Sequence, residues 1–126
     1  MIAFAALALG GALGGACRYL ATRALDQRLG TGFPWGTLAV NLSGAFAAGF
    51  IAGLLPQGEG RVLEFLLLAG FCGSYTTVSS WSLQTLALAH RQYYLRAFAN
   101  LLVTTLLGLL AIAGGLCFAG LAKGVL

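Results

Sequence analysis

Residues 70–84 read GFCGSYTTVSSWSLQ, and they decide how the rest of the chain is interpreted. They lie inside a segment without charged residues, from Phe65 to Ala89. Six of the nine residues from Ser74 to Ser82 are serine or threonine, and two glycines come just before them. Hydroxyl side chains compete for backbone hydrogen bonds, and glycine weakens helices through its conformational entropy. In a bilayer, irregular backbone is tolerated only where protein buries it or water reaches it, so the stretch predicts a helix that breaks at an ion or substrate site.

The composition predicts a membrane protein. Of the 126 residues, 60% are hydrophobic and 8% are charged, whereas soluble domains carry about 25% charged residues. A membrane helix needs about 20 apolar residues, so four helices with short loops use almost the whole chain. We therefore expect one all-α domain, residues 1–126, in the inner or plasma membrane, with four transmembrane helices and the third broken at mid-membrane. The net charge of +4 is small and spread over the loops, which favours anchoring at the membrane surface over binding of nucleic acid.

Four apolar segments are expected to span the membrane, at residues 2–22, 34–55, 61–89 and 97–121. The first contains Gly10-x-x-x-Gly14, which places small residues one turn apart and permits close helix packing. A turn is expected at residues 56–60, and four spans put both termini on one side.

The charge bias between the two sides is weak. Seven Lys and Arg residues divide five against two, with the larger group on the side opposite the termini. The positive-inside rule then favours termini outside, but a chain with so small a bias can insert in both orientations.

Several polar side chains fall within the spans. The Asn41 amide either pairs with a neighbouring helix or lines a pore, and Arg18 either reaches the interface or faces a polar vestibule. Asn100 and Thr104 are one turn apart, share a face, and are expected to face the polar side of the third span.

The chemistry of these residues narrows the function. Asp26 and Glu59 are expected in loops and Glu64 at the start of the third span, so no carboxylate is expected deep in the membrane, which argues against a proton-coupled small multidrug-type exporter. No nucleophile and base can be paired, so an enzyme is not expected. What remains is a neutral track of donors that suits a small hydrated anion, and backbone carbonyls freed between Gly73 and Thr77 that suit a cation. The track consists of Asn41, Ser79, Ser80, Asn100 and Thr104.

Three stretches, GALGGACRY (11–19), GTLAVNLSG (36–44) and GFCGSYTT (70–77), resemble the CrcB/Fluc family of fluoride channels in order and spacing. The resemblance implies a passive fluoride-specific channel that lowers cytoplasmic fluoride, built as an antiparallel dimer. It also implies a structural sodium ion (Na+) at the dimer centre, held by the backbone carbonyls of Gly73 and Thr76. Carried onto this chain, the fluoride path comprises Asn41, Val78, Ser79, Ser80, Trp81, Asn100 and Thr104, and Arg18 matches a family arginine.

The chain departs from the family pattern at three positions. The family has phenylalanines where this chain has Val78 and Trp81, and often a glutamate where it has Gln84, a residue expected with Arg18 at the vestibule or interface. Val78 offers no ring edge, whereas Trp81 keeps an aromatic edge and adds an indole N–H donor. These departures leave two alternatives open: a homodimer, or a heterodimer in which this subunit contributes an impaired pore beside a homologous partner.

Overall fold

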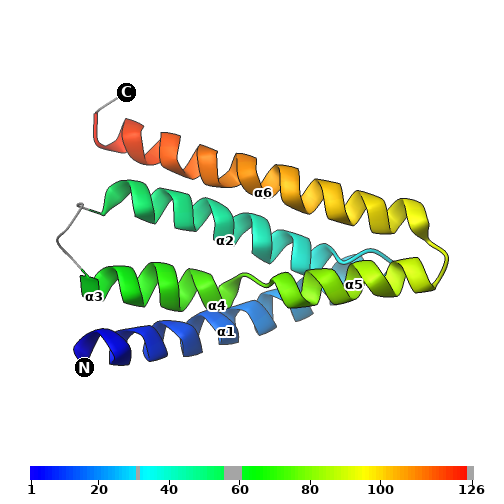
Figure 1. Cartoon of the computed structure of the whole chain (residues 1–126), viewed down its shortest axis with the longest axis horizontal. Helices are drawn as coiled ribbons and strands as arrows, with labels where there is room; N and C mark the ends of the chain where they lie inside the picture. The colour runs from blue at the N-terminus through cyan, green and yellow to red at the C-terminus, as the bar shows by residue number, and fades with distance from the viewer. Residues whose placement is uncertain (31, 56–60, 125–126) are drawn as a thin grey trace.

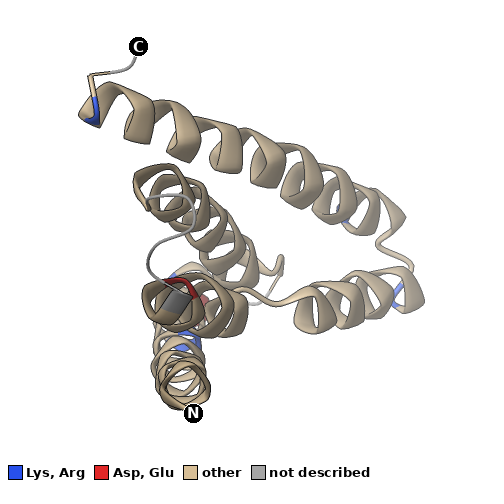
Figure 2. Cartoon of the chain, turned by 60° about the vertical axis from the view of Figure 1, so that its left-hand side comes forward, with Lys and Arg blue, Asp and Glu red and all other residues tan. Residues whose placement is uncertain are grey.

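Long apolar runs of the sequence form long helices in the computed structural model, which describes residues 1–30, 32–55 and 61–124. Helix α1 is Ile2–Leu29, α2 is Trp35–Leu54 and α6 is Tyr94–Ala122, and each is long and apolar enough to cross a membrane. The start of α1 and the end of α6 lie at the same end of the molecule (Figure 1). Figure 2 shows long tan stretches without charged residues along α2 and α6.

The segment predicted as the third span is not one helix. It begins with α3 (Arg61–Leu63), continues as a π-helical segment, η1 (Glu64–Cys72), and ends its first half with α4 (Gly73–Tyr75). Two extended residues, Thr76 and Thr77, come next, and α5 (Val78–His90) then forms the second half. The π-helix was not predicted; it shifts backbone hydrogen bonds to i→i+5, so that the Gly73 N–H donates to the Leu68 carbonyl.

The first half of this segment packs against α1 through glycine, as the Gly10/Gly14 spacing predicted. A Cβ atom at Gly10 would collide with the Leu66 carbonyl oxygen, and one at Gly14 with the Phe71 carbonyl oxygen. Helices α2 and α6 pack together in the same way, because a Cβ at Gly49 would collide with the Ile112 carbonyl oxygen.

Helix α1 is longer than the predicted span of residues 2–22. It continues to Leu29 through charged residues that the sequence suggested were in a loop, because a helix outside the apolar layer needs no apolar residues. Asp26 therefore lies on α1, and its Oδ1 accepts the N–H of Gly36 in the first turn of α2 at 3.1 Å. A carboxylate at this position satisfies a free helix N–H.

The other boundaries differ less. Helix α2 runs within one residue of its predicted ends, while α6 begins at Tyr94, three residues earlier than expected, because Leu95 and Arg96 are good helix formers. The predicted turn at residues 56–60 lies outside the described residues.

Candidate functional site

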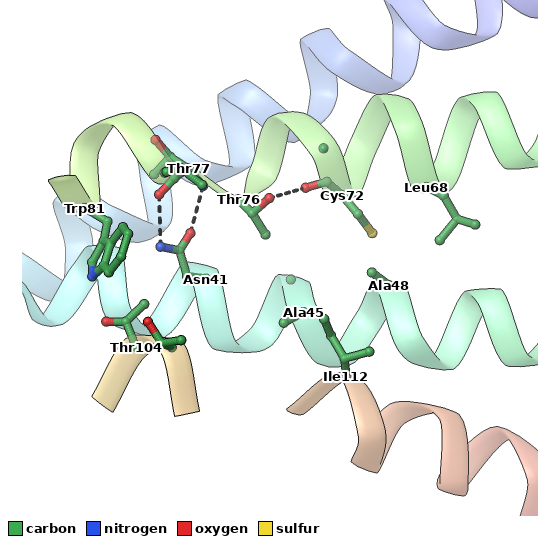
Figure 3. Close-up of a pocket in the computed structure, with 14 residues that line it drawn as sticks. Asn41, Ala45, Ala48, Leu68, Cys72, Thr76, Thr77, Trp81, Thr104 and Ile112 are labelled. Atoms are coloured by element: carbon green, nitrogen blue, oxygen red, sulfur yellow. Dashed lines mark hydrogen bonds between the residues drawn. The ribbon is translucent and has the colours of Figure 1, made fainter. Parts of the chain in front are cut away.

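The interruption of the third segment is held by one side chain from α2. The Thr77 N–H donates to Asn41 Oδ1 at 2.7 Å, and Asn41 Nδ2 donates to the Thr77 carbonyl at 3.0 Å (Figure 3). Thr77 has extended backbone angles, φ −151° and ψ 118°, so both of its backbone groups face one neighbour. The amide thus replaces partners that a helix would supply, and of the two sequence interpretations of Asn41 the structure contains the interhelical pairing.

Hydroxyl groups gather around Thr77 where α5 begins. Thr77 Oγ1 accepts the Ser80 N–H at 3.2 Å and is therefore the N-cap of α5. The same hydroxyl lies 3.2 Å from Ser79 Oγ and donates to Ser80 Oγ at 3.1 Å. The predicted Ser79 and Ser80 therefore pair with the break itself.

A cleft of about 440 Å³ opens on one side of the break, between α2, the third segment and α6 (Figure 3). Its walls are almost entirely apolar. Six of the predicted site residues line it: Asn41, Gly73, Thr76, Val78, Trp81 and Thr104.

A second cleft, of about 700 Å³, lies against α1 and contains the polar side chains. Arg18, Ser80 and Gln84 all line it, so the structure brings together the two residues expected at a vestibule and one expected on the anion path. Arg23 and Asp26 add charge to its wall. Gln84 Oε1 is buried and has no hydrogen-bond partner among the described residues. Thr77 lines both clefts, so the Asn41–Thr77 pair stands between them.

The remaining predicted residues tie α5 to α6. Asn100 is 1% exposed and its Nδ2 donates to Thr85 Oγ1 at 2.7 Å, while Thr104 Oγ1 donates to Asn100 Oδ1 at 3.4 Å. The Trp81 indole N–H donates to the Asn100 carbonyl at 3.1 Å. Asn100 therefore bonds to α5 at Trp81 and Thr85, not at the predicted Ser79 and Ser80, whereas the hydrogen bond of Thr104 is to Asn100 on its own helix.

Thr85 was missed by the sequence interpretation. Its hydroxyl accepts from Asn100 and donates to the Trp81 carbonyl at 2.8 Å. The available signal was its position four residues after Trp81, which places both on one face of α5. The predicted donors therefore do not form one continuous track. Asn41 and Thr104 line the apolar cleft and Ser80 lines the polar cleft, whereas Ser79 and Asn100 line neither.

Long apolar helices around two clefts define this chain as a multi-pass membrane protein. The family model described as "CrcB-like protein, Camphor Resistance (CrcB)" matches residues 5–116. The "Fluoride-specific ion channel FluC 2" of Rhodopseudomonas palustris (strain BisB18) is 43% identical over 113 residues, covering 86% of each chain. The "Fluoride-specific ion channel FluC" of Paracoccus denitrificans (strain Pd 1222) is 42% identical over 113 residues, covering 90% of each chain. The chain belongs to the CrcB family.

Proposed function

We propose that this chain is a non-enzymatic subunit of a fluoride-specific ion channel in the cell membrane, through which fluoride passively leaves the cytoplasm. One observation carries the proposal: a third segment interrupted at Thr76 and Thr77, between an apolar cleft and a cleft lined by Arg18, Ser80 and Gln84. Relatives 40–43% identical over most of the chain are named as fluoride-specific channels, which supports the same conclusion.

Positive charge and hydroxyl donors in the polar cleft suit a small anion. Arg18 and Arg23 attract fluoride from solution, and the Ser80 hydroxyl replaces part of the water that fluoride loses. We assign the path onward to Asn41, Val78, Ser79, Trp81, Asn100 and Thr104. Since the Trp81 indole N–H is bonded to the Asn100 carbonyl, this residue presents its ring rather than its N–H to an ion.

A structural sodium ion fits the carbonyls at the break. The Thr77 N–H that would bond to the Gly73 carbonyl in a continuous helix is held by Asn41, which leaves that oxygen without its helical donor. The Thr76 carbonyl accepts Arg18 Nη1 at 3.4 Å and, with two lone pairs, keeps one for a cation. Gly73 and Thr76 would hold the ion, which would neutralise the carbonyl dipoles. Because one chain supplies few ligands, we propose an antiparallel dimer with the break at mid-membrane.

Fluoride efflux from liposomes tests the proposal. Purified protein is reconstituted in vesicles loaded with potassium fluoride, and a fluoride electrode records release when valinomycin is added. We expect rapid fluoride release and no chloride release from matched vesicles. The absence of efflux, both from this chain alone and together with a homologous subunit, would contradict the proposal.

A heterodimer is the second candidate, and Val78 favours it. This side chain lines the apolar cleft at a position where the family has a phenylalanine, and it offers an anion no ring edge. Efflux that requires co-reconstitution with a homologous subunit supports the heterodimer, whereas efflux from this chain alone supports the homodimer.

A further inference from the structure

We infer that Asn41 is a positioning residue: it keeps the third segment broken by holding both backbone groups of Thr77, and it acts on ions through that break. The functional part of this inference rests on the proposed channel function, whereas the structural part does not. Asn41 thereby acquires a role at the cation site, through Gly73, that differs from lining the anion path.

The Asn41 amide is used entirely on Thr77. Both polar ends of the Asn41 side chain bond to one residue, at 2.7 and 3.0 Å, across 36 positions of sequence. Thr77 is 7% exposed, so without Asn41 its backbone groups would have little access to water. A buried backbone group without a partner is costly, and the local alternative is to resume the helix by bonding the Thr77 N–H to the Gly73 carbonyl.

The surface of α2 beside Asn41 is also shaped for the break. Gly44 is three residues further along and on the same face, where a Cβ atom would lie 2.5 Å from Thr76 Cγ2 and 2.9 Å from Tyr75 Cδ1. Helix α2 therefore contacts the break at two points: the Asn41 amide bonds to Thr77, and the absence of a side chain at Gly44 leaves room for Thr76. Together the two positions specify both residues that leave the helix.

The bond between Asn41 and Thr77 determines whether the Gly73 carbonyl oxygen is free. If the Thr77 N–H is held by Asn41, the oxygen of Gly73 is free; if it is released, the same N–H can close on Gly73 and occupy that oxygen. Asn41 thus determines whether a carbonyl in the lining of the apolar cleft is available to a cation.

Amide hydrogen exchange at Thr77 tests this role. The protein is labelled with ¹⁵N-threonine in detergent micelles, and exchange is followed for Thr77, Thr85 and Thr104. We expect Asn41→Ala to accelerate Thr77 exchange about tenfold or more, without a comparable change at the two helical threonines. The bond to Gly73 can replace the amide only part of the time, because a helical Thr77 would give up the extended backbone with which it caps α5. Asn41→Asp retains the acceptor for the Thr77 N–H, so protection should stay within about threefold of the unmodified chain.

Ser43→Ala is the matched control, because Ser43 lies on the same helix and bonds to the Ala39 carbonyl and the Tyr75 hydroxyl rather than to Thr77. It should leave Thr77 exchange unchanged. If Asn41→Ala does not yield folded protein, Asn41→Gln, whose amide is displaced by one methylene, is measured in its place with the same expectation.

Two results would overturn the inference. One is unchanged Thr77 exchange in Asn41→Ala, since Asn41 would then not hold the break; reduced fluoride efflux in the same variant would indicate that Asn41 acts on the ion directly. The other is equal acceleration at all three threonines, which would indicate a general loss of stability. The exchange measurement needs no ion flux. Failure of efflux from the unmodified chain, both alone and with a homologous subunit, would therefore reject the channel function and leave the Thr77 result standing.

Discussion

The two halves of the interrupted third segment are held in place by different means. The first half, from α3 to α4, packs on α1 at glycines, where backbone touches backbone. The second half, α5, is joined to α6 by side-chain hydrogen bonds from Trp81, Thr85 and Asn100. Both halves lie between longer helices. The first half adds one hydroxyl contact with α2, between Tyr75 and Ser43, to its backbone packing, whereas the second half depends mainly on side-chain hydrogen bonds.

The difference between the two halves follows from the lipid that surrounds membrane helices. Lipid tails are as apolar as leucine side chains, so burial of leucine gives little preference for one helix partner over another. Close packing at glycines fixes the position of the first half mainly through shape. The second half is oriented against α6 by hydrogen bonds. Each such bond between membrane helices contributes only about 0.6 kcal/mol to stability on average. We therefore expect the first half to be sensitive to added volume and the second to lost polar groups.

The largest effect is expected from Gly14→Ala in the first half. The new methyl group collides with the Phe71 carbonyl oxygen, and overpacking of this kind costs about 3 kcal/mol when backbone cannot move away. Thermal unfolding in detergent should show a strongly lowered midpoint or little folded protein. Gly15→Ala is the control, since no atom lies within 4 Å of its Cβ position. Equal behaviour of the two variants would contradict the glycine attachment.

An intermediate effect is expected from Asn100→Ala in the second half. The substitution removes the amide that bonds to the Thr85 and Thr104 hydroxyls, of which Thr85 keeps its bond to the Trp81 carbonyl, and we expect a loss of about 1–2 kcal/mol of unfolding free energy. Thr105→Val, whose hydroxyl bonds to the Leu101 carbonyl of its own helix, should cost less. Reversible unfolding in a detergent series measures both, and a larger loss for Thr105→Val would refute the attachment of α5 through Asn100.

A smaller effect is expected from Trp81→Phe. The ring is kept while the N–H bond to the Asn100 carbonyl is lost, which should cost about 0.5–1 kcal/mol. Trp35→Phe is the matched control, because Trp35 is 44% exposed near the start of α2. If both tryptophan variants unfold alike, the indole bond does not fix α5.

The smallest effect on stability is expected from Val78→Phe, because Val78 is 71% exposed and little packing changes. Under the proposed function, the added ring edge should raise fluoride efflux, and Val78→Leu, which adds volume without a ring, should not. Unchanged efflux after Val78→Phe would speak against an impaired aromatic path.

Those helix contacts that depend only on the spacing of residues along the sequence were largely predictable. The Gly10/Gly14 spacing predicted close helix packing at that face of α1, without identifying the third segment as the partner, and the Asn100/Thr104 spacing suggested a polar contact with the third segment, which Asn100 makes with α5. The break was expected between Gly73 and Thr77, and the extended residues are Thr76 and Thr77. Its depth in the membrane and the cation at its carbonyls stay predictions.

Other features depend on partners that spacing does not identify. The sequence could not decide whether the Asn41 amide would bind an ion or backbone, because the answer depends on a residue 36 positions away. Thr85 is one of many hydroxyl residues, and its place between Trp81 and Asn100 appears only when α5 meets α6. Asp26 was expected in a loop because charge suggested the end of a helix.

The Asp26 contact also bears on how the chain is assembled during synthesis. Asp26 and Gly36 are ten residues apart, so their hydrogen bond can form as soon as the connection between α1 and α2 has left the ribosome. The corresponding tie of α6, from Arg96 Nη1 to the Gly32 carbonyl, joins residues 64 positions apart and must wait for most of the chain. We therefore expect the first two helices to be able to pair as a capped hairpin before the interrupted segment is synthesised.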